Sequence, residues 1–112
     1  MNEPEMFEMS TPTDIRRAGE GHVVDWLKAE KYSIKWNTQA TGVIGIEAQS
    51  SSKRLLVHVK TAVYPNGPDR LSAEEERAIT SRAAILGAQA WEARVQVGSK
   101  LELIGNVQWR KI

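Results

Sequence analysis

Three side chains within residues 42–61 have the types and spacing that phosphodiester chemistry uses. The segment GVIGIEAQ reads as a short strand that carries Glu47, and RLLVHVKT reads as the next strand, with His58 and Lys60. Because side chains alternate along a strand, His58 and Lys60 face the same way. A carboxylate on one strand of a hairpin and a lysine on the next is the layout of a metal-dependent phosphodiesterase site. Glu47, His58 and Lys60 are therefore the candidate catalytic residues.

The composition of the chain limits the classes of protein to consider. Its 112 residues allow one domain, and the apolar fraction of 41% suits a globular protein. The absence of cysteine excludes disulfides and thiolate metal sites. No apolar run approaches the roughly 18 residues of a membrane helix, and the N-terminal sequence lacks the features of a secretory signal. We therefore expect a cytoplasmic protein with no membrane partner.

Charge is distributed unevenly along the chain. Residues 1–14 carry a net charge of −4, whereas residues 15–112 carry +5. A mildly basic body can bind a polyanion such as DNA or RNA, although a solvated surface would have the same composition. We expect a flexible acidic tail over residues 1–10 and one domain over residues 11–112. The candidate nucleic-acid contacts are Lys53, Arg54, Arg77 and Arg82.

Two helices have clear start signals. Thr11 can cap a helix that begins at Pro12, and Asp14 adds an early negative charge that suits the helix dipole. The apolar spacing that follows predicts about four helical turns. Ser72 with Glu75 forms a capping box for a second helix. Its alanine-rich inner side would let this helix lie close to a sheet.

The remaining segments alternate between apolar and polar residues and are separated by turn residues, which predicts strands. The predicted strands cover residues 32–37, 43–49, 54–61, 91–97, 101–104 and 107–112. The order is thus a helix, three strands, a second helix and further strands. We predict an α/β (α+β) fold with a central mixed sheet flanked by two helices and with extra C-terminal strands. The terminal strands could form an exposed edge, and a homodimer would pair such edges.

This order, αβββαβ, resembles the core of the restriction-endonuclease-like or PD-(D/E)XK superfamily. The closer likeness is to the small YraN-like and Holliday-junction-resolvase-like proteins. These open with a helix bearing G-x-x-x-E-like signals and continue with strands such as G-Y-x-I-x-x-N, G-E-I-D-L-I-A and V-E-V-K-T. The counterparts here are AGEGHVVDWLKAEKYSIKWN at residues 18–37, GVIGIEA at 42–48 and LLVHVKT at 55–61. The resemblance implies a nuclease-like fold and a site for Mg²⁺ or Mn²⁺.

The resemblance also assigns roles, which this chain keeps only in part. In the related families, acids on the second and third strands bind the metal ion, and the lysine supports the nucleophile or the phosphate charge. The lysine corresponds to Lys60, whereas the two acids fall on Gly45 and His58. The first-helix acid would be Glu20. Glu47 returns to the face of Gly45 two residues later, so the implied metal ligands are Glu47 and Glu20.

Each candidate also has an ordinary structural interpretation. Lys60 and Glu20 could be surface residues, Glu47 could be ion-paired, and His58 could be a hydrogen-bonded core residue or a ligand for zinc or manganese rather than magnesium. Trp109 suits core packing, with base stacking or dimerisation as alternatives. We favour a nuclease-like fold that binds nucleic acid and has lost or impaired catalysis. The alternatives are an active divalent-metal-dependent endonuclease or resolvase, a non-catalytic protein-interaction module, and an unrelated α/β domain.

Overall fold

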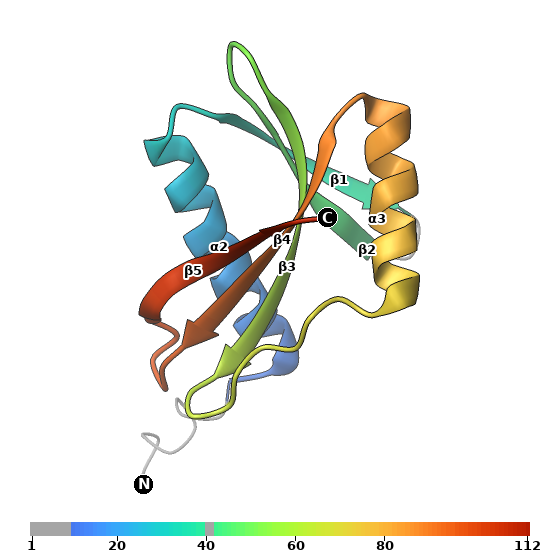
Figure 1. Ribbon diagram of the computed structural model, residues 1–112. Helices are drawn as coiled ribbons and strands as arrows, with labels where there is room; N and C mark the ends of the chain where they lie inside the picture. The colour runs from blue at the N-terminus through green and yellow to red at the C-terminus, as the bar shows by residue number, and fades with distance from the viewer. Residues whose placement is uncertain (1–9, 40–41) are drawn as a thin grey trace, which may run out of the picture.

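The chain folds into a five-stranded mixed sheet with one helix on each face, so the predicted fold class is confirmed (Figure 1). The structure is a computed structural model and describes residues 10–39 and 42–112. The predicted tail, residues 1–10, lies outside the described residues except for Ser10. The elements are α2 (Pro12–Ala29), β1 (Ser33–Gln39), β2 (Gly42–Gln49), β3 (Arg54–Val63), α3 (Ala73–Leu86), β4 (Gln89–Val97) and β5 (Leu103–Lys111).

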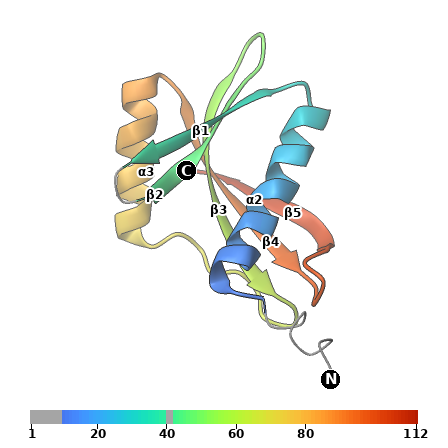
Figure 2. The same cartoon turned by 180° about the vertical axis from the view of Figure 1, so that it is seen from behind.

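The strands follow one another across the sheet in the order in which they occur in the chain. Neighbours are antiparallel except for β3 and β4, which are parallel. A parallel pair needs a long crossover connection, and α3 provides it. Figure 2, seen from behind, again shows α2 and α3 on opposite faces of the sheet. Within the described ranges, neither helix is long and apolar enough to cross a bilayer.

Both predicted helix starts are confirmed by reciprocal hydrogen bonds. The Thr11 hydroxyl accepts from the Asp14 N–H at 3.0 Å, and the Asp14 carboxylate accepts from the Thr11 N–H at 3.2 Å. Ser72 and Glu75 form the same pair of bonds at the start of α3, at 3.1 and 2.8 Å. Gly87 ends α3 in the left-handed conformation, which glycine adopts without steric strain. These caps fix the residues at which both helices begin.

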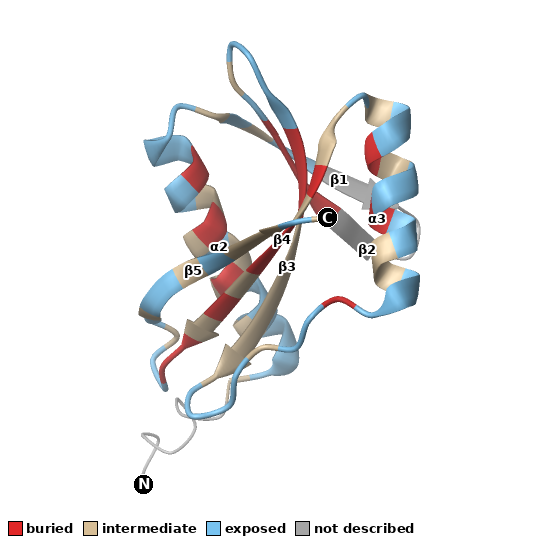
Figure 3. Ribbon diagram, viewed as in Figure 1, coloured by how far each residue is buried: buried red, intermediate tan, exposed pale blue. Residues whose placement is uncertain are grey.

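The sheet has a buried apolar layer on each face (Figure 3). On the α2 face, the side of the sheet covered by α2, Val23 and Leu27 pack against Val57 and its neighbours on β4. On the α3 face, Ile79 packs with Leu56 in a second, smaller cluster. Alternate residues of β3 therefore serve different cores.

At the C-terminus, one continuous strand, β5, replaces the two separate strands that the sequence indicates, and residues 101–102 of the first predicted segment lie outside it. β5 contains Gly105, which has a positive φ of 70°. The ladder is irregular there, because Arg94 pairs with Gln108 whereas Gln96 pairs with Ile104. The turn-like residues at 105 and 106 thus form a bulge inside the strand. β1 and β5 are the edge strands, and the homodimer stays a prediction.

Candidate functional site

His58 and Lys60 lie on the α3 face of β3, beyond the part of the strand that carries buried Leu56. His58 and Lys60 each have a paired residue on β4, and each of those has a paired residue on β5. The pairing produces two polar rows across β3, β4 and β5, which consist of His58, Glu92 and Arg110, and of Lys60, Arg94 and Gln108. Ionisable and amide side chains therefore gather at this end of the α3 face.

The Lys60 ammonium is held by a carboxylate from α3. Lys60 Nζ lies 2.8 Å from Glu75 Oε2, and the two side chains are 26% and 36% exposed. Burial acts to raise the pKa of Glu75, but hydrogen bonds from Lys60 and from the Ser72 N–H, together with nearby positive charge, outweigh it and lower that pKa. The predicted catalytic lysine is thus paired with an acid that also caps a helix.

Glu20 and His58 are close enough for their charges to interact. Burial raises the pKa of Glu20, and the charges of Arg16, His58 and Arg17 offset only part of that rise. The charge of His58 also contributes to the lowered pKa of Glu75. His58 therefore interacts with both Glu20 and Glu75, and Glu75 also binds Lys60. We call these four residues the His58 group.

Glu75 is the functional candidate that sequence reasoning missed. Its spacing from Ser72 identifies it as a capping residue, and that role is confirmed. Its contact with Lys60 joins residues that are 15 apart in the chain, and local periodicity does not report such a contact. The connection between β3 and α3 spans residues 64–72, and its course, which sequence patterns do not reveal, determines that the start of α3 lies near Lys60.

The position of Glu47 along β2 places it away from the His58 group. Glu47 is 7% exposed, and the ladders place it between Lys35 on β1 and Leu56 on β3. Leu56 precedes Lys60 by four residues, which is about 13 Å along a strand. Glu47 shares the α3 face with Lys60, but a metal ion held by Glu47 would lie far from the Lys60 backbone.

Gly45 has no room for the acid that the resemblance assigns to its position. A Cβ atom built on Gly45 would lie 2.7 Å from the carbonyl oxygen of Val57 and 3.3 Å from Leu56 Cδ1. Since the first of these neighbours is backbone, it cannot rotate away. A carboxylate at residue 45 therefore requires β2 and β3 to separate locally.

The donors present do not fit the metal site that the resemblance implies. Mg²⁺ and Mn²⁺ prefer carboxylate oxygens, whereas the two strand positions are glycine and histidine. Glu20 and Glu75 are the carboxylates of the His58 group, and Glu75 already binds Lys60. Among residues 10–39 and 42–112, no group of three or more His, Asp or Glu side chains is placed to hold a metal ion.

A second acid on this face, Glu92, has a structural role. Its fully buried carboxylate accepts from the Leu71 N–H at 2.6 Å and from Arg110 Nε at 2.9 Å, while Arg94 Nε lies 3.8 Å away. Arg110 also binds Glu76 on α3. Burial acts to raise the pKa of Glu92, but these hydrogen bonds and charges outweigh it and lower that pKa. The network fastens the start of α3 to the sheet.

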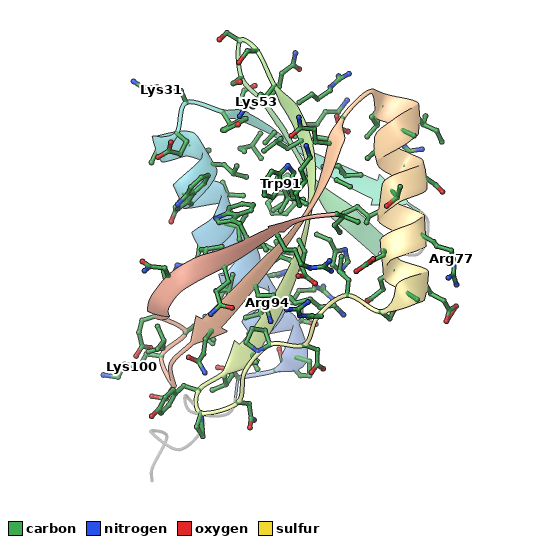
Figure 4. The ribbon with its side chains drawn as sticks, in the orientation of Figure 1. Lys31, Lys53, Arg77, Trp91, Arg94 and Lys100 are labelled. Atoms are coloured by element: carbon green, nitrogen blue, oxygen red, sulfur yellow. The ribbon has the colours of Figure 1, made fainter. Side chains whose placement is uncertain are left out.

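The four predicted nucleic-acid contacts lie on different surfaces. Lys53 lies in the turn before β3 and lines a pocket with Trp26 of α2, whereas Arg54 Nη1 donates to the Leu86 carbonyl at the end of α3. Arg77 projects from α3 away from the sheet (Figure 4), and Arg82 is half-buried on the same helix. These residues therefore do not form one continuous basic stripe.

Comparison with protein-family models and with curated proteins found no match to this chain. The superfamily indicated by the motifs around Gly45, His58 and Lys60 accordingly stays a prediction.

Proposed function

We propose that this chain is a nucleic-acid-binding protein of the restriction-endonuclease-like superfamily in which metal-dependent cleavage has been lost. The observation that carries the proposal is the state of the three strand positions where catalysis would occur. Position 45 is glycine with no room for a side chain, position 58 is histidine, and Lys60 is paired with Glu75.

Loss of cleavage follows from the chemistry of these positions. Hydrolysis of a phosphodiester by this route needs a metal ion to hold the phosphate and to generate hydroxide. The acids that would hold the ion are missing, and Glu47 is displaced along the sheet by about four residues or 13 Å from the row of Lys60. The Lys60 charge is also neutralised by Glu75 before any phosphate arrives.

Binding of nucleic acid is supported by the charge of the folded part and by exposed cations. Residues 15–112 carry +5, and Lys53 and Arg77 are exposed. Contacts of this kind act on the phosphate backbone and release counterions. We therefore expect binding that depends strongly on salt and weakly on sequence.

The test measures binding and cleavage on the same labelled substrates. Fluorescence anisotropy would follow a four-way junction, a duplex and a single strand at 50 and 200 mM salt. With about four phosphate contacts, affinity should fall about 100-fold over this range. Gels run with about 10 mM Mg²⁺ or Mn²⁺, a concentration that would fill even a weak site for these ions, should show no cleavage product.

Matched charge reversals sharpen the result. Lys53→Glu and Arg77→Glu should each weaken binding, whereas Lys100→Glu, an exposed lysine in the turn before β5, should change it much less. Cleavage that Lys60→Ala abolishes would instead establish an active endonuclease. The absence of binding to all three substrates at 50 mM salt would overturn the nucleic-acid role and favour the protein-interaction module.

A further inference from the structure

Three tryptophans gather on the α2 face, where β3 and β4 begin. The Trp109 ring centroid lies 4.9 Å from that of Trp26 and 6.3 Å from that of Trp91, with interplanar angles of 46° and 80°. These rings help to enclose a cavity of about 280 Å³. We call this cavity the tryptophan pocket, and its walls include Trp26, Trp91, Trp109, Tyr32, Gln89 and Lys53.

Core packing accounts for only part of this arrangement. Trp109 packs against the α2-face core, as predicted, but Trp26 keeps 42% of its surface exposed. Trp91 Nε1 donates to Gln89 Oε1 at 3.2 Å, whereas Trp109 Nε1 is buried without a hydrogen-bond partner among the described residues. The rings therefore form the wall of an open cavity.

Lysines flank the tryptophan pocket. Lys53 is exposed and forms part of the wall. Lys111 is exposed and pairs with Trp91 in the β4–β5 ladder, so both side chains lie on the α2 face. Figure 4 shows Lys31 and Lys53 above Trp91, at the same end of the molecule. Flat aromatic surfaces are thus combined with positive charge.

We propose that the tryptophan pocket receives an unpaired base of a single-stranded nucleic acid. The base would stack on the tryptophan rings, and the phosphates beside it would contact Lys53 and Lys111. Base stacking on aromatic side chains combined with a basic track is the usual basis of single-strand binding. The cavity is at the small end of the size range of ligand sites, which suits one planar ring.

This assignment deepens the proposed nucleic-acid binding and rests on it. It also adds a preference for single-stranded over duplex nucleic acid, because a base paired within a duplex cannot enter the pocket. Phosphate contacts alone do not provide this preference. The pocket lies on the face of the sheet opposite His58 and Lys60, since Leu55 lines the pocket while Leu56 faces α3. Changes in the pocket can therefore be made without altering Lys60 or Glu75.

The test uses the full chain, a single-stranded oligothymidine of about 12 nucleotides, within the range of known single-strand sites, and a duplex of equal length. Tryptophan quenching and anisotropy at 50 mM salt would report binding. Trp26→Ala should weaken single-strand binding about 5- to 150-fold and duplex binding much less. Trp36→Ala is the matched control, because Trp36 is 46% exposed on β1 and does not line the pocket. Its affinity should stay close to that of the wild type.

The outcomes separate the pocket from the general function. Circular dichroism would first check that Trp26→Ala and Trp91→Leu are folded. If both variants bind the single strand as well as the wild type does, the pocket assignment is overturned and the proposed function stands. Absence of binding to both probes would overturn both proposals. A dimer in light scattering that Trp26→Ala converts to a monomer would assign the pocket to a second copy instead and overturn the proposal.

Discussion

The buried carboxylate of Glu92 offers the sharpest test of how this fold is held together. Glu92 is 0% exposed and accepts charge-assisted bonds from the Leu71 N–H and Arg110 Nε. Substitution Glu92→Gln keeps the size of the side chain and one oxygen acceptor while removing the charge. It therefore probes the electrostatic part of the network with little change in packing.

The expected loss is worked from these two contacts, because the third, from Arg110 Nη2, is longer at 3.3 Å. Hydrogen bonds to charged groups contribute about 1.5–3 kcal/mol and neutral ones about 0.5–1.5 kcal/mol. Weakening two such bonds of a buried acceptor should lower the free energy of unfolding by about 2 kcal/mol at pH 7. This is a substantial part of the 5–15 kcal/mol typical of whole domains, and it should lower the urea midpoint by about 1 M.

The dependence on pH provides a second, independent readout. The pKa of Glu92 is lowered in the folded state, so its contribution to stability is complete above the ordinary carboxyl pKa and is lost as pH falls through the folded value. Glu92→Gln lacks this titration. The stability difference between wild type and variant should therefore be largest at pH 7 and should shrink below about pH 4.

Urea titrations followed by tryptophan fluorescence at pH 7, 5 and 3 would measure both effects. Glu74→Gln is the matched control, because Glu74 is exposed in the first turn of α3, and its effect should stay within about 0.5 kcal/mol. A Glu92→Gln variant as stable as the wild type, or a difference that is the same at pH 7 and pH 3, would refute the account of the network.

Four further substitutions test other contacts. Gly19→Ala should destabilise the fold by about 1–3 kcal/mol, because a Cβ there would collide with Thr61. Gly21→Ala has open space around it and should stabilise the exposed helix position by up to about 1 kcal/mol. Equal effects of the two substitutions in thermal melts would contradict this packing. Ser72→Ala should lower the free energy of unfolding by about 1 kcal/mol through loss of the α3 cap, and an unchanged urea midpoint would argue against it. Gly45→Ala should also lose about 1–3 kcal/mol by overpacking, and wild-type stability would mean that β2 and β3 separate easily.

Local signals in the sequence predicted most of the elements and their order. The caps at Thr11 and Ser72 are local hydrogen bonds between residues three apart, so spacing alone reveals them. The strand β3 is predicted almost in full, because its apolar residues favour a strand. In contrast, the residues at 105 and 106 resemble a turn but form a bulge within β5, since pairing with β4 overrides the local preference.

The candidate site could be predicted only in part, because its decisive contacts join distant segments. Alternation correctly places His58 and Lys60 on one face of β3. It does not reveal that Glu47 pairs with Leu56, because this pairing depends on the register between β2 and β3. The partner of Lys60, Glu75, comes from α3, and its position depends on how the intervening connection folds.

The contact between Gly45 and the Val57 carbonyl has a consequence for engineering. Two substitutions, Gly45→Asp and His58→Glu, would restore the letters of the nuclease motif, but they would not restore a site on the present backbone. The strands β2 and β3 would first have to separate far enough at Gly45 to admit a carboxylate. Reactivation of this scaffold therefore requires remodelling of the backbone. Introducing the two side chains alone would destabilise the protein without creating a catalytic site.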